Sequence, residues 1–238
     1  MKLIVAENYK ELSEKACNIV IREIKKKKKF VLGLAAGKTP LGLYKCLTKN
    51  LNSKKIKSEL IIFNLDEFWP IKKTDKRSFY YQLNKNFLSK IKIKKENIHL
   101  FNGETENPLE ECKNFEKAIK RNPIDLQILG VGKNGHIAFN EPLSSQESKT
   151  RVVKLSKETL ADLRKKYKKN FPEKALTLGI KTILKAKKLL LLASGEEKAD
   201  AIKNLLMRKI NKSYPVTFLN KHKNLIVIID KKLKEEIR

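Results

Sequence analysis

The chain carries the sequence LGVGKNGHIAFNEP at residues 129–142. Three glycines that directly follow an apolar run, residues 125–130, are typical of a strand ending in a loop with unusual backbone dihedrals. His136 and Glu141 stand five residues apart, and Pro142 disfavours the helical region for Glu141, so the chain is expected to fold back there. We therefore predict a loop at a strand end in which Glu141 orients the His136 imidazole, as paired proton-transfer groups require.

Six further short runs have the composition of strands. They are residues 3–5, 30–34, 60–65, 98–100, 188–193 and 225–230. Apolar side chains between them recur near a 3.6-residue period, as in Leu12, Ala16, Ile19 and Ile24. Strands that alternate with helices predict an α/β fold, an open and mostly parallel Rossmann-like sheet with helices on both faces. Ligands bind beyond the carboxyl ends of the strands in such sheets, so the segments after each strand are the candidate site.

The composition suits one folded domain over residues 1–238. Apolar residues make up 41% of the chain, enough for an ordinary core. Lys+Arg number 54 against 26 Asp+Glu, a net charge of +28. Lysine is spread along the whole chain and no aromatic-interleaved basic motif occurs, so a solvated lysine-rich surface is favoured over a nucleic-acid partner. Residues 143–167 are polar and helix-like without a clear apolar face, which predicts a helical lid over about 143–170.

Cysteine usage and the amino-terminal residues indicate the compartment. Cys17, Cys46 and Cys112 are odd in number, far apart and without a C-x-x-C pair, which argues against a zinc ribbon or a disulfide framework and favours a reducing compartment. The apolar run at residues 3–6 is too short for a signal peptide, and no run approaches the ~20 residues of a membrane span. We expect a cytoplasmic protein with no membrane partner.

The segment GLAAGKTP at residues 33–40 follows one of the predicted strands. Thr39 is a plausible N-cap and Pro40 suits the first position of a helix. The two glycines allow backbone N–H groups to face an anion at the positive end of that helix. The segment matches neither the P-loop nor G-x-G-x-x-G, so the choice between a plain turn and an anion site stays open.

Two adjacent carboxylates end another apolar run, FNLDEF at residues 63–68. Neighbouring residues on a strand point to opposite faces, so only one of Asp66 and Glu67 can enter a shared pocket. A carboxylate pressed against Phe68 and Trp69 would have its charged form disfavoured and could act as a base near neutral pH. The alternative is an acid that caps a helix.

Lys198 lies in the segment ASGEEKA, residues 193–199, where a predicted strand gives way to a helix. A cation in the first turn of a helix opposes the helix dipole, and an anion bound between them would resolve the conflict. We interpret Lys198 as a second phosphate contact. A solvated lysine is the alternative.

Together these segments resemble the glucosamine-6-phosphate deaminase (isomerase) family. Residues 130–142 resemble its signature G-x-G-x-[DN]-G-H-I-[AG]-F-N-E-P, residues 33–40 its phosphate loop, and residues 63–68 its F-N-M-D-E-Y strand end. Residues 78–81, 175–179 and 195–199 resemble further family segments. The resemblance runs in order over nearly the whole chain.

The resemblance implies ring opening of glucosamine 6-phosphate, isomerisation through an enediol-type intermediate, and hydrolysis to fructose 6-phosphate and ammonia, without metal or organic cofactor. Asp66 matches the base that moves the proton between C2 and C1, and Glu67 would then face the scaffold. His136 matches the imidazole that shuttles the proton in ring opening, and Glu141 the carboxylate that orients it. Asn134 stands where some members have Asp; an amide can hydrogen-bond the site but cannot share protons.

The resemblance also implies which residues bind the phosphate and which oligomeric state to expect. Phosphate would be held by Gly37, Lys38, Thr39 and Lys198, with one more cation from Arg164 or Lys165. The chain ends soon after its last predicted strand, whereas allosteric hexameric members carry a longer tail. An unregulated monomer or small homo-oligomer is expected.

Three alternatives remain open. A 6-phosphogluconolactonase shares the fold but typically follows Gly-His with an Ala-Ser-Leu-Phe-Pro-like run, so Glu141 discriminates against it. A deaminase of another aminosugar phosphate, such as galactosamine 6-phosphate, differs by one epimeric hydroxyl that the sequence does not reveal. A catalytically silent sugar-phosphate sensor predicts loss of Asp66 or His136, and both are present.

Overall fold

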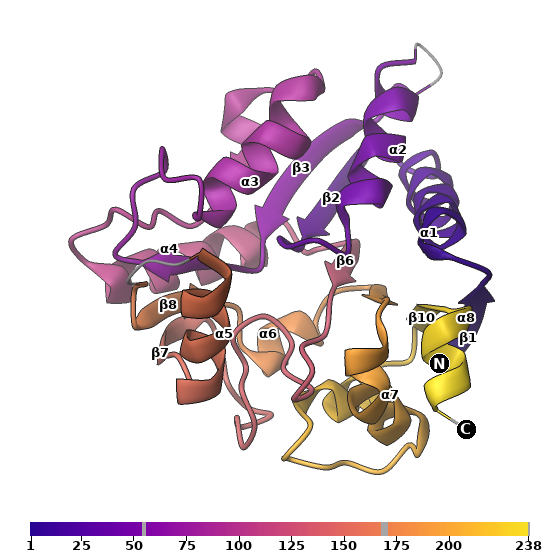
Figure 1. The fold of residues 1–238 in the computed structure, drawn as a ribbon. Helices are drawn as coiled ribbons and strands as arrows, with labels where there is room; N and C mark the ends of the chain where they lie inside the picture. Colours follow the sequence, from indigo (N-terminus) through magenta and orange to yellow (C-terminus); the bar gives the residue numbers. More distant parts are fainter. Residues whose placement is uncertain (54–55, 168–170, 238) are drawn as a thin grey trace.

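The computed structural model describes residues 1–53, 56–167 and 171–237 (Figure 1). Its larger sheet has seven strands in the order β1-β10-β9-β6-β2-β3-β5, and every neighbouring pair is parallel. The strands are β1 (Lys2–Ala6), β2 (Lys29–Leu34), β3 (Glu59–Asn64), β5 (Ile98–His99), β6 (Leu126–Leu129), β9 (Leu189–Ala193) and β10 (Leu225–Asp230). The seven predicted runs are all confirmed, because parallel strands covered on both faces read as continuous apolar segments.

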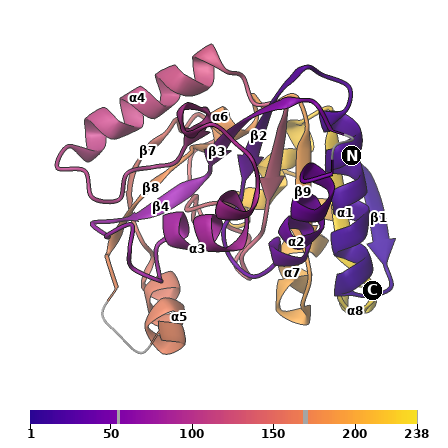
Figure 2. The same ribbon diagram turned by 90° about the horizontal axis from the view of Figure 1, so that it is seen from above.

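Helices cover both faces of this sheet, as predicted. The α-helices of the described residues are α1 (Tyr9–Ile24), α2 (Leu41–Leu51), α3 (Phe79–Asn86), α4 (Pro108–Arg121), α5 (Lys157–Tyr167), α6 (Ile180–Ile183), α7 (Ala199–Leu206) and α8 (Lys231–Glu236). Helices α1 and α2 lie on connections that lead toward β5, and α4 and α7 on connections that lead back. The right-handed rule for connections between parallel strands puts these two pairs on opposite faces. Figures 1 and 2 show α1 and α2 side by side.

A second, antiparallel sheet was not predicted. Its order is β4-β8-β7, with β4 (Asp66–Trp69), β7 (Arg151–Lys154) and β8 (Lys174–Thr177). A separate apolar cluster lies against it. The cluster consists of Phe68, Ile71, Phe139, Leu155, Leu160, Phe171 and Ala175. The chain passes from β3 of the large sheet to β4 of the small one through the single residue Leu65, so the two sheets meet next to Asp66.

The helical prediction for residues 143–167 is wrong over its first half. Turns and β7 fill that half, and only α5 is helical. The absence of an apolar face is also wrong, because Leu160 of α5 is buried in the second cluster and Leu163 and Tyr167 pack against it. These three side chains lie among mostly charged neighbours along the helix, so no apolar face is evident in the sequence. The predicted lid also includes residues 168–170, which lie outside the described residues.

Two local predictions are corrected. A disulfide joins Cys17 of α1 to Cys46 of α2, with the two Cα atoms 6.1 Å apart. The helices lie side by side, so cysteines 29 residues apart in the sequence meet. Helix α2 begins at Leu41 with Pro40 as its cap residue and no side-chain cap bond, so Thr39 is not an N-cap. None of the helices in the described part of the chain is long and apolar enough to cross a membrane.

Candidate active site

A cavity of about 270 Å³ lies at the carboxyl ends of the strands of the large sheet. The loop after β2, the start of β4, the loop after β6 and the segment after β9 all reach it. Its polar lining includes Lys38, Thr39, Asp66, His136 and Lys198, together with Gly37. The structure therefore brings together residues from all four predicted post-strand segments.

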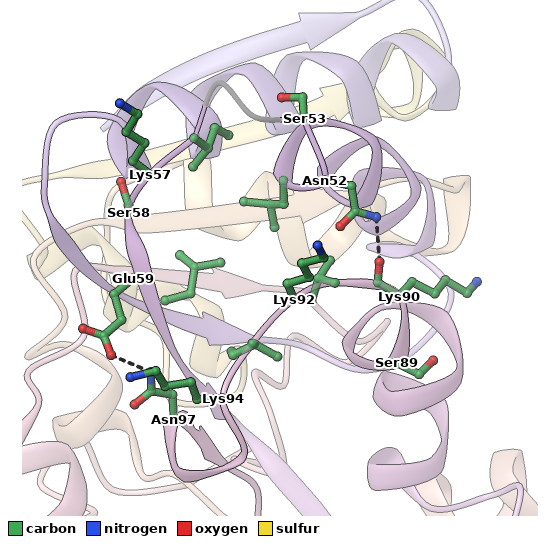
Figure 3. A pocket seen from close by; sticks show the side chains of 15 residues that line it. Asn52, Ser53, Lys57, Ser58, Glu59, Ser89, Lys90, Lys92, Lys94 and Asn97 are labelled. Carbon is green, nitrogen blue, oxygen red and sulfur yellow. Dashed lines mark hydrogen bonds between the residues drawn. The ribbon is translucent and has the colours of Figure 1, made fainter.

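A larger cavity of about 820 Å³ lies at the opposite end of β3 (Figure 3). Leucine and isoleucine side chains form its floor, and Glu59 accepts a hydrogen bond from Asn97 there. The cations around it are Lys57, Lys90, Lys92 and Lys94. It holds no carboxylate–imidazole pair among its described lining residues. Size alone does not make a catalytic site, so we assign the chemistry to the smaller cavity.

Asn64 fixes the position of Asp66. The Asn64 side chain is buried, its Nδ2 donates to the carbonyl oxygen of Asp66 at 2.9 Å, and its Oδ1 accepts from Phe101 N at 3.0 Å. Leu178 N donates to Leu65 O, which ties the same bend to the residue after β8. These bonds satisfy the backbone where the chain leaves one sheet for the other, and they hold Asp66 at the cavity.

Asp66 and Glu67 have opposite surroundings, as alternation along a strand requires. Burial raises the pKa of Asp66 well above its usual value, and the neighbouring Glu67 charge raises it further. The Glu67 carboxylate accepts from Phe68 N, Phe79 N and Tyr80 N at 2.7–2.9 Å, away from the cavity. Burial raises the pKa of Glu67 to about 7, and these three bonds oppose the rise. Asp66 is thus the carboxyl available to a ligand, and Glu67 anchors α3.

His136 is oriented through an intervening amide. Its Nδ1 lies 2.7 Å from Asn134 Oδ1, and Asn134 Nδ2 donates to Glu141 Oε2 at 3.0 Å. Glu141 Oε2 is 3.7 Å from His136 Nδ1. A carboxylate only accepts, so Asn134 must direct its carbonyl oxygen at His136 and accept from Nδ1–H. Glu141 therefore acts on the imidazole through Asn134 rather than directly, and Nε2 carries the free lone pair.

The surroundings of the His136 ring favour its neutral form and pack it closely. Burial lowers its pKa; the Glu141 charge opposes this effect and the Lys198 charge adds to it. The ring lies over the backbone of Gly132, where an added Cβ would be 2.2 Å from His136 Cε1. Glycine at 132 is required by this close approach, and Gly135 by its φ of +79°.

Two polar residues that sequence reasoning missed hold the His136 loop. Thr177 Oγ1 of β8 accepts from Phe139 N at 3.1 Å. Asn140 is fully buried, and its Nδ2 donates to Ile137 O and Leu178 O. Both lie inside the quoted family segments, so the available signal was an uncharged polar residue within a recognised motif. The bonds of Thr177 to Phe139 and of Asn140 to Leu178 each join residues 38 positions apart.

The loop after β2 has the features of an anion site. Gly37 has a φ of +98°. The Tyr9 hydroxyl donates to Thr39 O at 3.0 Å and accepts from Gly42 N at 2.9 Å, so α1 is bonded to the end of this loop and to the start of α2. The sequence did not predict this role for Tyr9. Lys38 is exposed at the cavity rim.

Lys198 faces this loop across the cavity, and the other predicted cations do not. Gly195, with a φ of +105°, leads into the short 3-10 turn that carries Lys198. Arg164 lies on α5 with its Nη2 3.9 Å from Glu173 Oε1. Neither Arg164 nor Lys165 is among the described lining residues of the cavity. Within residues 1–53, 56–167 and 171–237, no cluster of three His, Cys, Asp or Glu is placed to hold a metal ion.

The strand ends of this parallel α/β sheet carry a glycine-containing anion loop, a buried carboxyl and an imidazole whose surroundings favour the neutral form. This combination is typical of an enzyme that moves protons on a small anionic substrate. Comparison with known sequences agrees with this class. The chain belongs to the family described as glucosamine-6-phosphate isomerases/6-phosphogluconolactonase, whose sequence model matches residues 6–228.

Individual relatives cover the chain end to end. A glucosamine-6-phosphate deaminase of Thermoanaerobacter sp. (strain X514) is 46% identical over 97% of this chain and 93% of its own. One from Clostridium botulinum (strain Langeland / NCTC 10281 / Type F) is 40% identical over 100% and 99%. A solved monomeric glucosamine-6-phosphate deaminase superposes with a TM-score of 0.95 at 36% identity over 100% of both chains. A 6-phosphogluconolactonase from Thermotoga maritima, with a TM-score of 0.77 at 21% identity over 96% and 98%, shares the fold alone.

Proposed function

We propose that this chain opens, isomerises and deaminates glucosamine 6-phosphate, which gives fructose 6-phosphate and ammonia. The observation that carries the proposal is the joint placement of Asp66 and the His136–Asn134–Glu141 chain around one cavity that ends at the Gly37 loop. Relatives that are 40–46% identical over nearly the whole chain and are named glucosamine-6-phosphate deaminase support the same reaction.

His136 serves ring opening. With Nδ1–H held by Asn134, the free lone pair of Nε2 accepts the proton of the O1 hydroxyl. The resulting imidazolium returns a proton to the ring oxygen O5 as the C1–O5 bond breaks. Glu141 stabilises the transient positive charge through Asn134, so Glu141 and Asn134 are positioning residues.

Asp66 serves isomerisation. Its carboxylate removes the C2 proton of the open-chain aldehyde and delivers it to C1, while O1 gains a proton that the C2 ammonium group loses, so the aldehyde becomes an alcohol and C2 becomes an iminium carbon. Water adds to C2 and the C–N bond breaks, which releases ammonia and leaves the ketone. The raised pKa of Asp66 suits this role, because a general base works best when its pKa lies near the working pH.

The phosphate lies between the Gly37 loop and Lys198 in this proposal. Backbone N–H groups at Gly37, Lys38 and Thr39 face it from the amino end of α2, and Lys198 supplies the opposing cation. Arg164 or Lys165 remains a proposed further contact. We also propose a cytoplasmic monomer or small homo-oligomer without a nucleic-acid partner; the solved relative described as monomeric supports the monomer.

Parallel assays of three substrates test the proposal. Glucosamine 6-phosphate should give ammonia and fructose 6-phosphate in equal amounts. Galactosamine 6-phosphate measures how strongly the cavity selects the C4 hydroxyl, and 6-phosphogluconolactone tests the alternative activity of the family. Hydrolysis of the lactone by folded protein that releases no ammonia would overturn the proposal.

A further inference from the structure

The hydroxyl of Thr159 reaches the loop that carries His136 and Glu141, here called the catalytic loop, from a different part of the fold. Thr159 lies on α5, which follows β7 of the small sheet, and is 9% exposed. Its Oγ1 donates to Glu141 Oε1 at 2.5 Å. Glu141 Oε2 is already occupied by Asn134. Each oxygen of the carboxylate therefore has its own donor, and the Glu141 plane is fixed from two sides.

This second donor determines which ring nitrogen of His136 carries the proton, and so whether Nε2 offers a lone pair to the substrate. The carboxylate can face Asn134 Nδ2 only while its rotation is restrained, and that bond turns Asn134 Oδ1 toward His136 Nδ1. If Glu141 rotates away, the Asn134 amide loses one of the two contacts that distinguish its ends, and the bond of 3.2 Å that its Oδ1 accepts from His136 N remains. A reversed amide would offer N–H to Nδ1 and select the tautomer with the proton on Nε2, which cannot act as a base toward the substrate.

Other contacts hold α5 in place without the hydroxyl. Lys133 of the catalytic loop pairs with Glu158 at 3.3 Å and with Asp162 at 3.0 Å, on either side of Thr159 along the helix. Leu160 is buried in the second apolar cluster beside Phe139. Removal of the Thr159 hydroxyl should therefore leave the helix docked and change only the bond to Glu141.

We propose that Thr159 is a positioning residue that selects the Nδ1–H tautomer of His136 through Glu141 and Asn134. Its consequence for turnover rests on the function proposed above, whereas its effect on the tautomer does not. Helix α5, which lies outside the catalytic loop, thus contributes a residue that positions the proton-transfer groups.

Imidazole ¹⁵N–¹H correlation spectra of wild type and Thr159→Val, recorded at about pH 8.5, test the tautomer of His136. The chain has three histidines, and His222 is an internal reference because its Nε2 lies 2.7 Å from Ala186 O and its Nδ1 accepts from Asn224 N. His136 should carry Nδ1–H in wild type and shift toward Nε2–H in the valine variant, while His222 stays unchanged. An unchanged His136 tautomer in Thr159→Val would overturn the proposal whether or not the protein deaminates the sugar.

Kinetics give a second, separate readout. Loss of a hydrogen bond to a charged group predicts a roughly 10- to 100-fold lower kcat for Thr159→Val, with a smaller change in KM because the Thr159 hydroxyl donates to Glu141 and is not one of the proposed phosphate contacts. Thr159→Ser keeps the hydroxyl and should restore kcat. Thr48→Val is a matched control, since that hydroxyl bonds only within its own helix, to Tyr44 O. A serine variant as impaired as valine would refute the role of the hydroxyl.

Discussion

The Gly132→Ala substitution displaces the His136 imidazole by an amount that the structure specifies. An alanine Cβ at 132 would lie 2.2 Å from His136 Cε1, 2.4 Å from Nδ1 and 2.5 Å from Nε2. Carbon atoms in contact are normally ~3.5–4.0 Å apart, so the ring must move by roughly 1.3 Å or more. Gly132 has no positive φ, so its backbone accepts alanine, and the three atoms nearest to the added Cβ all belong to the His136 ring.

This displacement should remove the bond that orients the ring. The Nδ1–Oδ1 distance of 2.7 Å to Asn134 would lengthen toward about 4 Å, beyond hydrogen-bonding range. A misplacement of ~1 Å in a catalytic group costs about 100-fold in rate. We therefore expect Gly132→Ala to lower kcat about 100-fold, close to 2.7 kcal/mol in the barrier, with a smaller effect on KM.

Steady-state ammonia release gives kcat, and the imidazole NMR signals of His136 report the displacement directly. Gly130→Ala is the matched control for the NMR measurement, because a Cβ at Gly130 meets no atom within 4 Å and should leave the His136 signals unchanged. Wild-type kcat in folded Gly132→Ala would refute the assignment of His136 to proton transfer.

Three further predictions concern the other parts of the site. Lys198→Ala should mainly raise KM, because Lys198 faces the phosphate loop, and an unchanged KM in steady-state kinetics would remove it from the site. Asp66→Asn should raise the calorimetric unfolding temperature more at about pH 8 than at about pH 4. Because the pKa of Asp66 is raised in the folded protein, the cost to stability grows as the pH rises above the unfolded-state pKa of about 3.9 and is complete above the folded-state pKa; equal shifts at both pH values would contradict this. Asn64→Ala leaves Phe101 N and Asp66 O without their partner, so chemical denaturation should show a loss of about 1–3 kcal/mol, and a loss below about 0.5 kcal/mol would contradict the role given to this bend.

The sequence predicts the large sheet well and the small one not at all. The buried parallel strands are continuous apolar runs, so each is visible locally. Strand β4 begins with two carboxylates, β7 has a basic residue at each end, and β8 begins with a lysine. Their strand character comes from pairing with other segments, and β4 pairs with a segment more than 100 residues away, as Asp66 does with Thr177. No local pattern contains that information.

In the candidate site, too, some residues could be predicted from the sequence and others could not. Asp66, His136 and the Gly37 loop stand in recognisable post-strand motifs, so their convergence at one sheet edge follows from the fold class. The roles of Asn134, Thr159 and Tyr9 depend on which atom faces which across the fold. The Cys17–Cys46 contact is of the same kind, because it requires knowing that α1 and α2 are neighbours.

The most direct test of Asp66 as the carbon base compares the Asp66→Asn variant with wild type. Ammonia release measures turnover, and calorimetry measures binding of glucosamine 6-phosphate. The amide has the shape of the carboxyl but cannot accept the C2 proton, so turnover should fall by about 10²- to 10⁴-fold while the sugar phosphate still binds. Ammonia release at the wild-type rate by the asparagine variant would contradict the account.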